Sequence, residues 1–235
     1  MLDFLFKKRE AEKYSDKLNS LYGLLKSKYG EVSAERKSEL SEILEKNGYY
    51  SYPYYYALEN LTDAETLFCL EYKWTQNGVF KDGLFVFDND NVSVLKRNNI
   101  TDSSWIKREG HDIKLINLAG LGNRKKEAGK FIDWLKQLAM LPTGNLKDGI
   151  FNTTIYLIPF HPREFGCAYL PKSSEVSPEL LDKDLMEYTG LDAKGQLKTF
   201  IQMAQLAGHP VIYDILPQTG RFSKAVLANP CIARW

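Results

Sequence analysis

The chain has 235 residues, of which 44% are hydrophobic and 26% charged, and its formal net charge is +1. This composition is typical of a soluble globular protein, and the length suits one large domain or two small ones. Acidic and basic residues are interspersed, so the sequence lacks the basic surface of a nucleic-acid-binding protein and the polybasic patch of a membrane-binding one. We therefore expect neither nucleic acid nor membrane as a partner.

The amino-terminal segment and the cysteines indicate the compartment. The sequence MLDFLFKKREAEK starts with apolar residues, but Asp3 and the charges from Lys7 onward leave no room for a signal-peptide core. No apolar run approaches the ~20 residues that a membrane-spanning helix needs. Cys69, Cys167 and Cys231 are odd in number and widely spaced, which predicts neither a disulfide framework nor a CxxC metal site. We expect a cytoplasmic protein with reduced thiols, no metal and no cofactor.

Residues 1–109 are predicted to form helices followed by a small antiparallel sheet. Apolar residues recur at helical spacing between residues 4 and 46, and a second helix is expected from Ser33 to Glu45. From Thr66 to about Lys107, the segments TLFCLEYKW, GLFVFD and NVSVLKR are rich in β-forming residues and are separated by turn sequences. This pattern predicts three or four short strands.

A tyrosine-rich segment, YYSYPYYY, lies between these helices and strands. Its tyrosines, between residues 49 and 56, could stack on a sugar or a base. They could also wedge the helices onto the small sheet, because each ring has an apolar body and a polar tip. We favour the packing role.

Residues 110–235 alternate between strand-like and helix-like patterns. The predicted strands cover residues 113–119, 153–160 and 210–216, and the predicted helices cover residues 124–141, residues 194–206 and a third segment that begins near Ser223. Strands that alternate with helices in this way are typical of right-handed parallel βαβ units. We therefore expect the three strands to lie side by side and to run in the same direction.

In parallel α/β folds, ligands bind on the loops at the carboxyl ends of the strands. The same rule predicts that polar residues from three loops meet at one edge of this sheet. They are Asn117 after the first strand, His161, Arg163, Glu164 and Tyr169 after the second, and Asp214, Gln218, Thr219 and Arg221 after the third.

Several of these residues also have an interpretation that needs no ligand. Asp214, a lone carboxylate in the apolar run VIYDILPQTG, could bond only backbone amides or an arginine of the neighbouring strand. His161 could cap a turn, and Arg163 and Glu164 could be solvated loop charges. His111 and His209 lie at the amino-terminal ends of their strands, where we do not expect a functional role.

Four segments of this region follow one another in a familiar order. They are the helix KFIDWLKQL, the strand TIYLIPF with Pro159, the loop GCAYLP with Tyr169, and the strand VIYDILPQTG with Asp214. In this order, residues from about Asp112 to Arg221 resemble the first part of the catalytic barrel of the alpha-amylase family of glycoside hydrolases, glycoside hydrolase family 13.

The resemblance implies an oligosaccharide-binding rim. The residues expected to contact the sugar are His161, Arg163, Tyr169, Gln218 and Thr219, and those expected to support the rim are Asn117, Pro159 and Asp214. The sequence also departs from the family. Gln218 replaces an asparagine that helps to bind calcium, Thr219 replaces a histidine that contacts the sugar, and Leu170 replaces the aspartate of a Gly-Tyr-Asp motif.

The expected fold is α/β: a small α+β region over residues 1–109, then a partial (β/α)8 TIM-barrel-like parallel sheet over residues 110–235. A complete barrel takes ~250 residues, and the catalytic acids of the alpha-amylase family lie on its fourth, fifth and seventh strands. We therefore expect a glycosidase-like fragment that has no catalytic residue of its own and is inactive alone. The remainder of the barrel, or a partner chain, is expected to cover the sheet edge.

Two alternatives remain open. One is a non-catalytic module that binds a glycan or a protein. The other is an enzyme of a different α/β class that uses His161, Arg163 and Asp214 on a small phosphorylated or carboxylated ligand.

Overall fold

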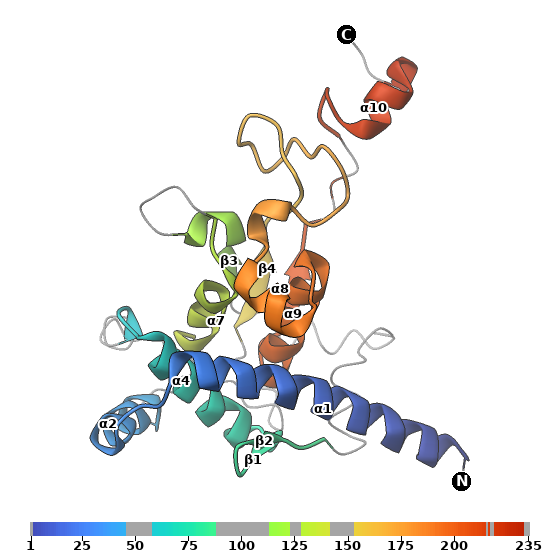
Figure 1. Cartoon of the computed structure of the whole chain (residues 1–235). Helices are drawn as coiled ribbons and strands as arrows, with labels where there is room; N and C mark the ends of the chain where they lie inside the picture. The colour runs from blue at the N-terminus through green and yellow to red at the C-terminus, as the bar shows by residue number, and fades with distance from the viewer. Residues whose placement is uncertain are drawn as a thin grey trace. The chain divides into compact units, whose positions relative to one another are not determined.

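The structure is a computed structural model that describes residues 2–45, 58–87, 113–122, 128–141, 153–214, 216 and 219–232 (Figure 1). The chain forms two compact units. The first unit combines Met1–Ile113, Leu135–Thr154 and Ile201–Pro210, and the second combines Lys114–Trp134, Ile155–Phe200 and Val211–Trp235. Within the described residues, none of the helices combines the length and the hydropathy that crossing a bilayer requires.

Two helices at the start of the first unit confirm the predicted periodicity. They are α1 (Leu2–Tyr29) and α2 (Ala34–Glu45). In α1 the side chains of Leu18, Leu21 and Leu25 are buried, as the helical spacing requires. Gly30 ends the helix with a φ of 80°, and its N–H donates to the Lys26 carbonyl oxygen at 2.9 Å.

The next helix, α4 (Asp63–Gln76), corrects the sequence analysis, because the segment TLFCLEYKW lies in this helix and is not a strand. A capping box starts α4: the Thr62 hydroxyl accepts from the Glu65 N–H, and the Glu65 carboxylate accepts from the Thr62 N–H at 2.7 Å. Leu67, Leu70 and Trp74 are then buried at helical spacing. The capping residues and this burial outweigh the β propensity of the segment.

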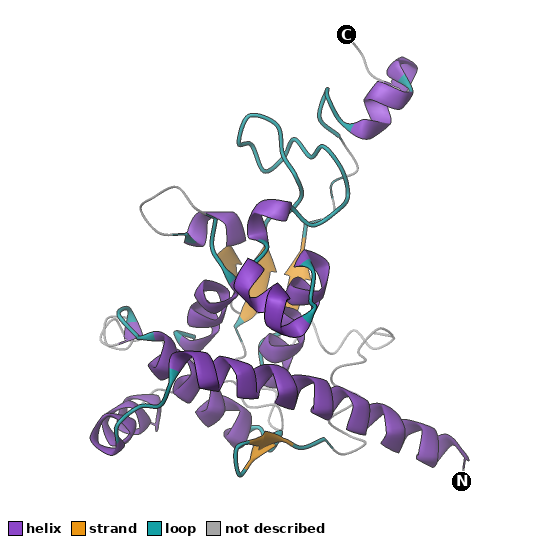
Figure 2. Cartoon of the chain, viewed as in Figure 1, coloured by secondary structure: helices purple, strands orange, loops and turns teal. Residues whose placement is uncertain are grey.

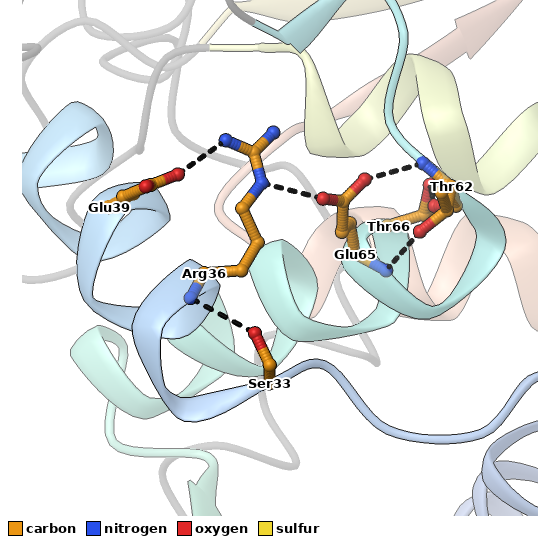
Figure 3. Close-up of polar contacts among 6 residues, drawn as sticks. All are labelled: Ser33, Arg36, Glu39, Thr62, Glu65 and Thr66. Atoms are coloured by element: carbon orange, nitrogen blue, oxygen red, sulfur yellow. Dashed lines mark hydrogen bonds and ion pairs between the residues drawn. The ribbon is translucent and has the colours of Figure 1, made fainter.

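Arg36 of α2 reinforces the start of α4 (Figure 3). Its guanidinium Nε donates to Glu65 at 2.6 Å, and its Nη1 donates to Glu39 at 2.9 Å. The same Glu65 carboxylate thus serves the cap and the ion pair.

A short hairpin follows α4 in the first unit. Its strands are β1 (Phe80–Lys81) and β2 (Leu84–Phe85), which pair antiparallel. Asp82 and Gly83 form the predicted turn, with φ angles of 52° and 82°. The remaining predicted strand NVSVLKR and the tyrosine-rich segment at residues 49–56 lie outside the described residues.

The second unit contains the predicted parallel sheet. Its strands are β3 (Ile113–Ile116), β4 (Thr154–Leu157) and β5 (Val211–Tyr213), in the order β3-β4-β5 (orange in Figure 2). β4 and β5 pair in parallel, and the Ile158 N–H donates to the Ile116 carbonyl oxygen at 3.1 Å. The prediction that the three strands run side by side in one direction is confirmed. In the part of the chain that the structure describes, this sheet does not close into a barrel.

Helices follow the strands in the predicted order. They are η1 (Leu118–Leu121), α7 (Phe131–Ala139), η2 (Pro178–Leu180), α8 (Lys183–Thr189), α9 (Ala193–Leu206), α10 (Lys224–Ala228) and η3 (Pro230–Ile232). α9 matches the predicted helix at residues 194–206, whereas the described part of the helix predicted over residues 124–141 is helical only from Phe131.

α8 was not predicted from the sequence. Asp182 starts α8, because its side chain accepts from the Leu185 N–H at 3.1 Å. In the core, the ring of Trp134 lies 5.8 Å from the ring of Phe200 in an edge-to-face arrangement. The Trp134 indole N–H donates to the Gly129 carbonyl oxygen at 3.0 Å, which satisfies its polar atom.

Candidate functional site

The loops that follow β3, β4 and β5 form the candidate site, and we call them the rim. The loop after β4 spans residues 158–177, and the segment after β5 includes residues 219–223. These two parts are joined at Pro171, whose carbonyl oxygen accepts from the Gly220 N–H at 2.8 Å and from the Thr219 hydroxyl at 3.1 Å. The structure thus brings together residues that are about 50 positions apart in the chain.

The carboxylate of Asp214 has a partner on the neighbouring strand. It accepts a hydrogen bond from the Tyr156 side chain of β4, and this bond, followed by burial and the charge of Asp214, raises the pKa of Tyr156. The Asp214 N–H donates to the Leu157 carbonyl oxygen at 3.1 Å, which extends the pairing of β4 and β5. The partner of Asp214 is therefore a tyrosine, where the sequence suggested a backbone amide or an arginine.

Tyr169 lies close to this pair. Its side chain is 44% exposed, and its proximity to Tyr156 also raises the pKa of the Tyr156 hydroxyl. Tyr156, Tyr169 and Asp214 come from β4, the loop after β4 and the end of β5. The rim therefore places two phenols and one carboxylate in the same region.

Two other predicted residues are engaged by the loop itself. The His161 Nδ1 lies 2.9 Å from the Glu175 carbonyl oxygen. Arg163 forms an ion pair with Glu179, with 3.0 Å between Nη2 and Oε1. These contacts stabilise the loop, and they favour the structural interpretation of both residues over contact with an anionic ligand.

The other predicted residues lie in different settings. Asn117 precedes η1, and its carbonyl oxygen accepts from the Gly120 N–H at 2.9 Å. Pro159 lies in the loop just after β4, and Thr219 bonds the same loop through its hydroxyl. Gln218 lies outside the described residues.

The sequence analysis did not single out the two most exposed rings of the rim. Phe165 and Phe222 are 85% and 54% exposed, and their ring centroids lie 6.5 Å apart in an edge-to-face arrangement. Next to them lies the carboxylate of Glu164, which is buried and accepts from the Phe222 N–H. The exposure of these rings depends on how the two loops fold, so no local sequence pattern marks them.

The first unit holds a different polar cluster, formed by Lys73, His209 and Cys69, all of which are completely buried. The Lys73 Nζ donates to the carbonyl oxygens of Leu138, at 2.6 Å, and Leu141. Burial lowers the pKa of Lys73 to about 7 and raises that of Cys69 to about 12. With no solvent-exposed surface, this cluster joins helices and does not present itself to a ligand.

His209 was expected to have no functional role, and its setting is consistent with that expectation. Its Nδ1 lies 3.2 Å from the Thr153 carbonyl oxygen, and its buried Nε2 has no hydrogen-bond partner among the residues that the structure describes. Burial and the nearby Lys73 charge lower its pKa well below the usual range. Among the described residues, no group of three His, Cys, Asp or Glu side chains is placed to hold a metal ion.

Comparisons of the chain with protein-family models, with curated proteins and with solved structures find no match in any of the three. The chemistry of the rim must therefore be argued from its own residues. It offers exposed aromatic rings, phenol hydroxyls and one partly exposed carboxylate, a combination suited to hydrogen bonding and stacking.

Proposed function

We propose that the rim binds an oligosaccharide, as the opening part of a (β/α)8 barrel related to the alpha-amylase family. The observation that carries this proposal is the position of the exposed rings and of the Tyr156–Asp214 pair at the carboxyl ends of parallel strands. Ligand sites of parallel α/β folds lie at this edge. The motif order from Pro159 to Asp214 supports the same family.

The rim has the two kinds of group that sugar recognition requires. Phenylalanine and tyrosine rings can pack against the C–H face of a sugar, and polar groups can bond its hydroxyls. Asp214 keeps acceptor capacity after bonding Tyr156, because an ionised carboxylate has about four lone-pair sites. A sugar hydroxyl can therefore donate to Asp214 without breaking the Tyr156 bond.

Cleavage by the 235-residue chain is not expected. Retaining glycoside hydrolysis needs two carboxyl groups ~5–5.5 Å apart on either side of the scissile bond, one of which donates a proton. Glu164 is buried and bonded to the Phe222 N–H, and Asp214 is bonded to Tyr156.

Calorimetric titration with maltoheptaose, and separately with cellohexaose, tests the proposal. We expect heat of binding with at least one sugar, and we expect Tyr169→Ala to weaken that binding about tenfold. Tyr188→Ala is the matched control, because Tyr188 is 69% exposed on α8 and lies outside the rim loops. Absence of heat with both sugars would remove glycan binding, and release of reducing ends would contradict the expected lack of cleavage.

A further inference from the structure

Glu164 is a buried carboxylate between the two main loops of the rim. Its residue is only 2% exposed, although it lies in a loop between two strands. One carboxylate oxygen accepts from the Phe222 N–H of the segment after β5. A buried carboxylate costs free energy unless it is hydrogen-bonded, so this hydrogen bond is needed to keep Glu164 buried.

Gly220 makes this contact possible. A methyl group at Gly220 would lie 2.5 Å from the Glu164 carboxyl carbon and within 2.9 Å of both oxygens. Any side chain at this position would therefore push the carboxylate away from the Phe222 N–H. The pairing of Glu164 with Gly220 joins the loop after β4 to the segment after β5.

The residue after Glu164 is held in an uncommon conformation. Phe165 has a φ of 51°, and Gly166 follows with a φ of 74°. Two hydrogen bonds fix this turn: the Glu164 N–H donates to the Leu170 carbonyl oxygen at 2.9 Å, and the Cys167 N–H donates to the Glu164 carbonyl oxygen at 2.9 Å. A non-glycine residue in the left-handed region is held there only when its surroundings enforce it.

Glu164 thus contacts both segments that carry the exposed rings of the rim. It precedes Phe165 in the strained turn, and its side chain bonds the backbone of Phe222. The two rings meet edge to face, which leaves a face of Phe165 open to solvent. An exposed phenyl face that is fixed before binding loses little conformational entropy when a ligand covers it.

We infer that Glu164 is a positioning residue that fixes Phe165 and Phe222 as a platform on which one sugar ring of the bound oligosaccharide stacks. This inference rests on the proposed function and deepens it, since it assigns the apolar part of the site. The occupant is a pyranose ring, because the proposed ligand is an oligosaccharide and Tyr169 and Asp214 of the same rim offer hydrogen-bonding groups to its hydroxyls.

The test measures the dissociation constant of the sugar that the wild-type chain binds. We expect Phe165→Ala and Phe222→Ala each to weaken binding about tenfold, and Tyr188→Ala to leave it unchanged. Glu164→Ala should weaken binding to a similar extent, although Glu164 does not touch the sugar. Glu164→Gln should retain most of the affinity, because its amide oxygen can accept the same backbone bond.

A double variant separates positioning from other roles. If Glu164 acts through Phe222, the double variant Glu164→Ala, Phe222→Ala will have the same dissociation constant as whichever single variant binds the sugar less tightly. Gly220→Ala gives a second route, because it displaces the carboxylate without removing it. Thermal unfolding and the NMR contacts between the two rings show whether each variant keeps the rim folded.

The outcomes distinguish the two proposals. Wild-type binding that Phe165→Ala and Phe222→Ala leave unchanged overturns the platform and leaves glycan binding intact. Losses that add in the double variant overturn the positioning role of Glu164. Absence of wild-type binding to both maltoheptaose and cellohexaose overturns the platform together with the proposed function.

Discussion

The two units use ionisable side chains in opposite ways. In the first unit, Lys73 and His209 are completely buried, and burial lowers both of their pKa values. In the second unit, Asp214 is partly exposed at the end of β5, and Glu164, although buried, bonds the Phe222 N–H beside two exposed rings. The difference shows that a charged residue in an apolar segment indicates a site only where the fold brings it to an accessible edge.

The largest expected effect is a loss of stability when a buried aromatic residue of the first unit is replaced, compared with an exposed one of the second unit. Trp74→Ala removes a buried ring from the first unit, together with the indole bond to the Met203 carbonyl oxygen at 3.1 Å. We expect it to lower the free energy of unfolding by about 3–5 kcal/mol. Phe165→Ala in the second unit should change it by less than about 0.5 kcal/mol.

Urea denaturation of the two variants measures this difference. Equal losses of stability would show that the ring of Phe165 belongs to a core. This result would contradict the claim that the second unit presents an exposed ring where the first unit buries one.

The pH dependence of stability tests the buried amine. The pKa of Lys73 is about 7 in the folded chain, whereas an unperturbed lysine has a pKa of 10.5, so the unfolded state binds more protons between these values. Stability should therefore rise with pH above 7, by at most about 1.4 kcal/mol per pH unit. Lys73→Met removes this titration.

The measurement is the free energy of unfolding between pH 7 and pH 9. Glu71 has a pKa raised to about 7, so its titration lowers the stability with rising pH only below this window. Cys69 would affect the stability only above its unperturbed thiol pKa of 9.0, which is the upper limit of the window. Parallel curves for the wild type and Lys73→Met would contradict a neutral buried amine.

A smaller effect concerns the start of α4. Thr62→Ala removes the capping box and should lower stability by about 1 kcal/mol. Thr62→Ser keeps the hydroxyl and should restore most of the loss, as followed by thermal unfolding. A neutral Thr62→Ala variant would mean that burial alone, without the cap, makes this segment helical.

The smallest effect concerns the Tyr156–Asp214 pair. Tyr156→Phe removes the hydroxyl that bonds Asp214 and should lower stability by less than Thr62→Ala does, because solvent competes for this bond. Tyr213→Phe is the control, since Tyr213 is exposed on β5 and should tolerate the loss of its hydroxyl. An equal response of the two variants would argue against a specific Tyr156–Asp214 bond.

The spacing of apolar residues predicted the helices and strands whose buried residues follow one another regularly in the sequence. The buried leucines of α1 repeat at helical spacing, and the apolar run at residues 153–160 contains β4. Residues 66–74 were misassigned because their β-forming residues were weighed without the Thr62–Glu65 capping box, which was visible in the sequence. α8 was missed although Asp182 provides an N-cap signal.

The candidate site was predictable in outline and not in detail. The strand-end rule brought Tyr169, Thr219 and Asp214 to one edge, because it needs only the strand order. The burial of Glu164 and the exposure of Phe165 and Phe222 depend on how two distant loops meet. No local pattern encodes that meeting.

The most direct test of the rim as a sugar site is a titration followed by the backbone amide signals of the whole chain. With maltoheptaose or cellohexaose, we expect the amides of residues 164–170 and 219–222 to shift in a saturable way, while those of α4 stay fixed. Saturable shifts confined to the first unit, or no shifts at all, would contradict an oligosaccharide site at the ends of the parallel strands.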